Sequence, residues 1–237
     1  TQIEVRTLMA FYHSPRIVTD GLIAYFDALN PKSYPGSGTL LYDLTDLTNI
    51  ADVKNSPTYN ADGSFSMNGT DQYINMGTCE QYYPATGSLS LCASIWVKDT
   101  ASENSVVLGQ QNVANERLYI GRYSGNWNMA WGEQHWGDSY TGDLVATSAG
   151  FDNVVLNVIK GVPTLYVNAV ETISRTGDTN VSLTGPFPLG AYFGAPGVYI
   201  DASSGPNDSA ICQLYSRNLS VAELTQNFNA LKGRFGI

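Results

Sequence analysis

The residues best suited to binding a ligand are gathered in one stretch of the chain, residues 123–143. Three of the four tryptophans lie there, among tyrosines, amides and carboxylates. Aromatic rings stack on the apolar faces of pyranose sugars, and amide and carboxylate groups hydrogen-bond to sugar hydroxyls. The stretch therefore predicts a carbohydrate-binding site. Its candidate residues are Trp127, Asn128, Trp131, Trp136, Asp138 and Tyr140.

A second interpretation of the same tryptophans stays open. Trp127, Met129 and Trp131 alternate along the chain, so they share one face of a strand. Such a stripe is typical of the core face of a sandwich, where the rings pack rather than bind. Trp136 and Tyr140 follow in the adjoining loop, where core packing explains them less well.

The acidic residues form no evident catalytic pair. A retaining glycosidase needs two carboxylates about 5–5.5 Å apart, which alternate positions of one strand supply. No acidic residue on a predicted strand has another two or four positions away. The two histidines, His13 and His135, are too isolated for a Ser-His-Asp or Cys-His arrangement. We therefore expect a protein that is not an enzyme, with glycan hydrolysis the least favoured activity.

The composition disfavours several classes of partner. Lysine and arginine number 12 against 21 aspartates and glutamates, which gives a formal net charge of −9. This charge disfavours nucleic acids, whose phosphates bind basic patches, and anionic membrane surfaces. No apolar run approaches the roughly 18 residues of a membrane span. Only 14% of the residues are charged, which is more typical of extracellular or particle-bound β proteins than of cytosolic helical enzymes.

The cysteines predict no structural framework. There are three, Cys79, Cys92 and Cys212, and no Cys-x-x-Cys motif or Cys/His cluster accompanies them. They are too few and too scattered for a disulfide scaffold or a zinc site. We expect reduced cysteines, some of them buried.

Short β runs separated by Gly, Pro, Asn and Asp predict an all-β protein. The expected strands cover residues 21–28, 64–69, 72–77, 88–98, 104–110, 117–123, 127–133, 151–160, 163–170, 187–193 and 209–216. Helical periodicity occurs once, from Leu219 onward, where Ser220 and Glu223 form a capping box and Gly233 predicts the end. Strands without βαβ alternation indicate an antiparallel sandwich over residues 20–237. Residues 1–19 are an N-terminal arm or an edge strand.

Several segments resemble a known family when they are taken in order. They are residues 20–44, 65–77, LCASIWVK (91–98), TLYVNAV (164–170) and ICQLYSRNLSVAEL (211–224). Together they resemble laminin-G-like, concanavalin A-like lectin/glucanase domains, which implies an antiparallel β-sandwich jelly roll with one short C-terminal helix. The blocks NPKSYPGSGT (30–39) and NFNALKGRFGI (227–237) resemble the version found in structural proteins of tailed bacteriophages, particularly marine phages of cyanobacteria.

The resemblance implies a function that the residues alone do not. We expect a non-enzymatic virion structural protein, a capsid decoration or fibre protein on the particle surface, with weak glycan adhesion. The alternative is a lectin module with an aromatic stacking site. Expected partners are other virion proteins, further copies of the chain and host-surface glycans, with no nucleic acid and no membrane insertion.

Calcium is the one cofactor that the resemblance brings into consideration, because such sandwiches often hold it at the rim through oxygen ligands. The candidate ligands are Asp43, Asp46 and Asp71. Their spacing matches no self-contained calcium loop, and aspartates in turns often cap their own backbone instead.

Overall fold

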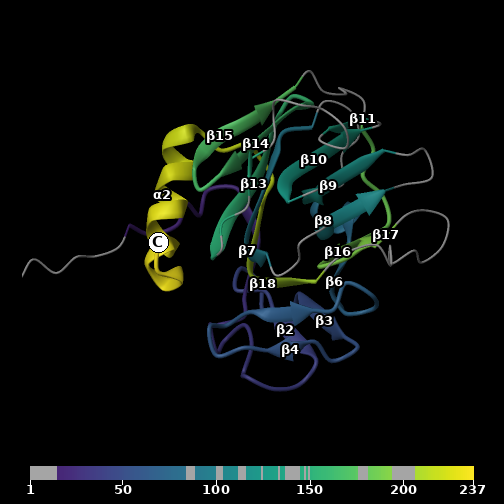
Figure 1. The fold of residues 1–237 in the computed structure, drawn as a ribbon, viewed down its shortest axis with the longest axis vertical. Helices are drawn as coiled ribbons and strands as arrows, with labels where there is room; N and C mark the ends of the chain where they lie inside the picture. Colours follow the sequence, from purple (N-terminus) through teal and green to yellow (C-terminus); the bar gives the residue numbers. More distant parts are fainter. Residues whose placement is uncertain are drawn as a thin grey trace, which may run out of the picture.

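The computed structural model describes residues 15–83, 89–99, 104–111, 116–123, 125–132, 134–136, 145–146, 148, 150–175, 181–193 and 206–237. Two sheets face each other across one core, and a C-terminal helix lies on the outside of one of them (Figure 1). The predicted antiparallel β-sandwich with a short C-terminal helix is therefore confirmed. Among the described strands, one pairing is parallel, that of β17 with β8.

The first sheet, here called sheet A, has eight strands, and β18 lies in its centre. Their order is β15 (Val170–Ser174), β14 (Val162–Val167), β13 (Phe151–Ile159), β7 (Leu91–Asp99), β18 (Asn207–Tyr215), β5 (Phe65–Met67) and β4 (Thr58–Tyr59), with β1 (Leu22–Asp27) paired to β18.

The second sheet, sheet B, carries the tryptophan stripe and has ten strands. Their order is β11 (Gln134–Trp136), β10 (Asn126–Gly132), β9 (Arg117–Tyr123), β8 (Ser105–Gln111), β16 (Pro186–Leu189), β6 (Tyr73–Thr78), β3 (Ile50–Lys54) and β2 (Leu40–Tyr42), with β12 (Val145–Ala146) paired to β10 and β17 (Tyr192–Phe193) to β8.

The tight turns follow from backbone preferences. Lys160 and Gly161 both have positive φ and join β13 to β14 in a two-residue hairpin. The predicted strand over residues 163–170 is wrong in one respect, because it is two strands. Asn168 (φ 52°) and Ala169 (φ 64°) form a second such turn between β14 and β15. Alanine is not a typical turn residue, so the residue types did not predict this hairpin.

The C-terminal helix α2 (Val221–Leu231) begins as predicted and ends differently. Ser220 Oγ accepts a hydrogen bond from the Glu223 N–H, and the Glu223 carboxylate accepts one from the Ser220 N–H. The α-helix ends at Leu231, two residues before the predicted stop at Gly233. The chain continues into the 3₁₀ helix η1 (Lys232–Phe235), and the left-handed residue that ends it is Gly236 (φ 74°). A single helical turn, α1 (Cys79–Tyr82), was not predicted.

Helix α2 and η1 cover the outer face of sheet A. Figure 1 shows the yellow helix lying alongside β13, β14 and β15. Trp96, on the outer face of β7, is buried and stacks on Phe228 (ring centroids 5.7 Å apart) and on Phe235 (4.5 Å). Burial of this aromatic group anchors the helix, with roughly 1.5–3 kcal/mol expected for each fully buried large apolar side chain. Among the described residues, no helix is long and apolar enough to cross a membrane.

The structure describes only the last part of the predicted N-terminal arm, from residue 15 onward. Residues 1–14 fall outside the described part, so the division into 1–19 and 20–237 stays a prediction. Residues 15–18 form no strand, so the edge-strand alternative does not hold for them. Val18 instead packs in the apolar cluster of Tyr215 and Leu224, between α2 and sheet A.

Candidate ligand-binding face

The two outer faces of the sandwich differ in what lies on them. The outer face of sheet A is covered by α2, which does not extend over sheet B. Along β10 the side chains alternate: Trp127, Met129 and Trp131 belong to the core cluster, so Asn128 and Ala130 point to the outer face. The outer face of sheet B is therefore the candidate ligand-binding face.

The structure places two of the candidate tryptophans in the core. The side chains of Trp127 and Trp131 are 0% exposed and pack between the sheets, which is the second interpretation of the alternating stripe. Neither offers a ring face to a ligand, so the site proposed below does not include them. The alternation predicts that the two rings share a face, but only the packing of sheet B against sheet A makes this face the inner one.

Trp127 also ties the two sheets together through a buried carboxylate. Its Nε1–H donates to Asp152 Oδ2 on β13 at 2.9 Å. The same oxygen accepts the Ser148 N–H at 3.0 Å, and Asp152 Oδ1 accepts the Asn168 amide at 2.8 Å. With these donors around it, Asp152 is a structural carboxylate that joins sheet B to the β14–β15 turn.

Asn128 is the candidate that lies on the outer face of sheet B. Its side chain is 1% exposed, and neither its amide nitrogen nor its amide oxygen has a hydrogen-bond partner. A buried polar group left unpaired costs about 1–3 kcal/mol. Such groups are rare in native structures, and each calls for a water molecule, a ligand or a conformational explanation.

A tyrosine that the sequence analysis missed lies beside Asn128. In the register of β9 and β10, Asn128 pairs with Gly121. A Cβ on Gly121 would collide with the Tyr119 hydroxyl and come within 2.6 Å of the Ser105 carbonyl oxygen, so the Tyr119 side chain lies over this glycine. The absence of a side chain at Gly121 thus brings a phenol ring next to the unpartnered amide. An isolated glycine within a strand was the sequence signal for this close approach.

The other candidate sugar-binding residues cannot be placed side by side with Asn128. The backbone of Trp136 belongs to β11 and pairs with Met129, but its side chain lies outside the described part. Asp138 and Tyr140 also lie outside the described residues. Their proposed role in sugar binding stays a prediction.

The candidate calcium ligands are engaged in hydrogen bonds within the protein. Asp43 Oδ1 accepts the Tyr25 N–H and the Thr45 N–H, each at 2.8 Å, and Asp43 Oδ2 accepts the Asn49 amide at 2.9 Å. Asp43 thereby holds the loop after β2 against β1. The arrangement resembles the backbone capping that the sequence analysis named as the alternative to calcium binding.

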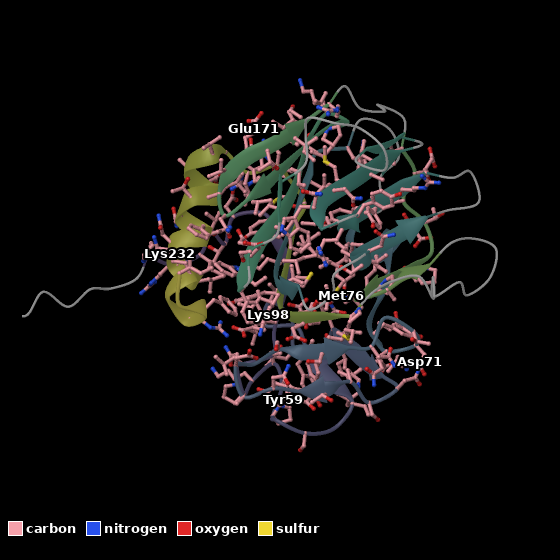
Figure 2. The ribbon with its side chains drawn as sticks, viewed as in Figure 1. Tyr59, Asp71, Met76, Lys98, Glu171 and Lys232 are labelled. Atoms are coloured by element: carbon pink, nitrogen blue, oxygen red, sulfur yellow. The ribbon has the colours of Figure 1, made fainter. Side chains whose placement is uncertain are left out.

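The other two candidate calcium ligands are exposed. Hydrogen bonds from the Thr48 hydroxyl (2.7 Å) and N–H (2.9 Å) lower the pKa of Asp46. Asp71 accepts the Asn68 amide at 2.8 Å in the loop between β5 and β6, at the edge of the molecule in Figure 2. Among the described residues, no group of three or more His, Cys, Asp or Glu side chains is placed to hold a metal ion.

The buried acidic residues and thiols in the described part serve the fold. The buried carboxylates there belong to Asp27, Asp43, Asp152 and Asp208, and each accepts a hydrogen bond from another side chain of the protein. The three cysteines are free and buried, as expected. Burial raises the pKa of each thiol, so none is primed as a nucleophile at neutral pH.

Comparison with known proteins identifies the fold and no family. No protein-family model and no curated protein matches the chain. A structure of Trypanosoma rangeli sialidase in complex with sialic acid matches 95% of this chain at TM-score 0.65 and 14% identity. The binding domain of botulinum neurotoxin serotype D/C VPI 5993 matches 89% at TM-score 0.63 and 11% identity.

These likenesses define a class of fold. The chain spans 37% of that sialidase chain and 52% of the neurotoxin chain. At such low identity they establish a shared architecture, a β-sandwich, and say nothing about substrate or partner.

Proposed function

We propose that the protein is a non-catalytic adhesion module that binds neutral glycans weakly through the outer face of sheet B. The observation that carries the proposal is the buried, unpartnered amide of Asn128 beside Tyr119. An aromatic ring can stack on the apolar face of a sugar, and an amide can hydrogen-bond to its hydroxyls. The net charge of −9 does not oppose a neutral ligand.

The burial of Asn128 accounts for weak binding. At 1% exposure, its amide becomes accessible only when the face opens around it. A ligand that binds an infrequent open state loses affinity in proportion to the population of that state. The amide then gains the hydrogen bonds that it lacks in the closed state, which offsets part of this cost.

The proposal that the module is not an enzyme rests on the carboxylates. In the described part of the chain, the four buried aspartates are held by protein donors such as Arg234 and the Trp127 indole. A glycosidase needs one carboxylate kept protonated as an acid and a second available as nucleophile or base. Incubation with labelled glycans that bind should release no product.

The first experiment is a glycan-array screen of the full chain, run with calcium and again with a chelator. Binding to neutral glycans that survives chelation supports the proposal, and loss on chelation assigns a metal to the site. No binding to any glycan, with calcium or with the chelator, contradicts the proposal. Replacing Trp136 and Tyr140 by alanine tests the two aromatic candidates outside the described residues. The replacement should lower binding without lowering the melting temperature.

We further propose that the module is displayed on the particle of a tailed phage, as a decoration or fibre protein. The support is the resemblance of residues 30–39 and 227–237 to phage structural proteins. Immunogold labelling of purified particles of the encoding phage tests this. Labelling at regular positions supports a virion role, and unlabelled particles contradict it while leaving the glycan proposal intact.

A further inference from the structure

The outer face of sheet A holds a short extended segment by its main chain. The Val18 N–H donates to Asn227 Oδ1 at 2.7 Å, and the Tyr215 hydroxyl donates to the Val18 carbonyl at 3.0 Å. The Asn227 amide nitrogen also donates to the Tyr215 hydroxyl at 2.9 Å. The two side chains therefore hold each other in position around the backbone of one residue, Val18.

A third side chain extends this grip toward the N-terminus. Gln226 Nε2, on the residue of α2 that precedes Asn227, donates to the Arg16 carbonyl at 2.7 Å. We call Tyr215, Gln226 and Asn227 the main-chain clamp. All hydrogen bonds between the clamp and the segment go to backbone atoms of the segment. The clamp therefore binds an extended peptide with no requirement for particular polar side chains.

Apolar contacts add a preference for the segment seated there. Val18 is buried in the cluster that contains Leu219 and Leu224, and Ile17 packs against the cluster that contains Trp96. The segment forms no ladder with either sheet. Its attachment thus depends on the clamp and on these two side chains, which makes it a separable piece of the fold.

A tight turn connects the segment to the sandwich. The Leu22 N–H donates to the Thr19 carbonyl at 3.2 Å, and Gly21 has φ 75°. A Cβ at Gly21 would lie 2.8 Å from Cγ of Arg217. The closed turn therefore requires glycine both for its backbone conformation and for space.

From these observations we propose that the main-chain clamp is an exchange site between copies of this chain. The N-terminal segment of one copy occupies the clamp of a second, and the turn at Asp20–Gly21 opens as the hinge. Each clamp contact forms again between the two copies. When each copy places its segment in the clamp of the other, the result is a closed two-fold dimer. Because the tethered segment has a high effective concentration in its own clamp, exchange is populated where copies are crowded or where the hinge is strained.

Cross-linking between two full-length variants tests the exchange. Chains carrying Arg16→Cys and chains carrying Gln226→Cys are refolded together at high concentration and treated with a short thiol-reactive cross-linker. The native cysteines are buried and do not compete. Exchange predicts covalent dimers that contain one chain of each kind.

The matched control pairs Arg16→Cys with Asp71→Cys, which lies on the side of the molecule opposite α2 in Figure 2. This pair should give several-fold fewer dimers, since random collision is its only route. Equal yields from the two pairs, or no dimer from either, overturn the proposal.

Straining the hinge gives a second and independent test. Gly21→Val disfavours the closed turn, so the dimer fraction measured by light scattering should rise several-fold. A variant that folds, melts at lower temperature and stays monomeric shows that Gly21 is only structural, and that result overturns the proposal. If Gly21→Val does not fold, the cross-linking result decides.

Discussion

The replacement Arg234→Met tests the ion pair that fastens the C-terminal turn to β1. The Arg234 guanidinium donates to both carboxylate oxygens of Asp27, at 2.7 and 2.9 Å. The Asp27 side chain is 4% exposed and that of Arg234 26% exposed. After the replacement, Asp27 keeps the Tyr25 hydroxyl at 3.2 Å and the Leu29 N–H at 3.1 Å.

The expected loss follows from this intermediate burial. Breaking a fully buried pair costs about 3–5 kcal/mol, and an exposed pair contributes about 0–1 kcal/mol. With one partner buried and the other a quarter exposed, we expect a loss of about 2–3 kcal/mol in the free energy of unfolding. For a chain of this size that lowers the melting temperature by roughly 4–12 °C.

Urea unfolding of the full chain measures this loss, with Lys232→Met as the matched control. Lys232 belongs to the same turn and lies over the Phe228 ring at 5.4 Å, without the buried carboxylate. The control should change the free energy of unfolding by about 0.5 kcal/mol or less. The double variant Asp27→Asn/Arg234→Met should lose less than the sum of its single changes. An Arg234→Met loss no larger than that of the control would refute the reasoning.

Three further predictions concern other buried or charged groups. Gln213 is 0% exposed with both amide atoms unpartnered, so Gln213→Met should raise the free energy of unfolding by about 1 kcal/mol in urea titration, and a loss would contradict this. Hydrogen bonds, chiefly from Arg217, lower the pKa of Glu223 to about 2. Because the pKa of Glu223 is lowered in the folded state, ionised Glu223 stabilises the fold, by about 1 kcal/mol or less at this partly exposed site. This stabilisation is present above pH about 4.5 and is lost as the pH falls toward 2. Glu223→Gln should remove that part of the pH dependence of unfolding. Asp152→Asn places an amide among three donors and should cost about 1–3 kcal/mol, measured by the urea midpoint against Trp127→Phe, which removes only one of those donors.

Local signals in the sequence predicted much of the fold. The capping box at Ser220 and Glu223 fixed the start of α2, and the break between the predicted strands 151–160 and 163–170 falls at the β13–β14 turn. The short strands β2, β3 and β4 were not predicted, because two to five residues carry too little alternation to stand out. The stacking of Phe235 of η1 on Trp96 is a tertiary contact that no local pattern reveals.

The candidate site was predictable only in part. Alternation placed Trp127 and Trp131 on one face of β10, but the inward direction of that face depends on how distant strands pair. Asn128 was a candidate by type, whereas its burial without a partner follows from packing. Tyr119 was missed because its place beside Asn128 depends on Gly121 in the same strand.

The most direct test of the central claim is a titration of wild-type, Asn128→Leu and Gln213→Met proteins with one neutral oligosaccharide taken from the array. The two variants remove the same kind of unpartnered amide from opposite sheets. We predict that Asn128→Leu weakens binding about fivefold or more, through the loss of two hydrogen bonds of about 0.5–1.5 kcal/mol each. It should keep or raise the melting temperature, and Gln213→Met should bind as the wild type does. Unchanged affinity in Asn128→Leu would contradict the assignment of the site to the outer face of sheet B.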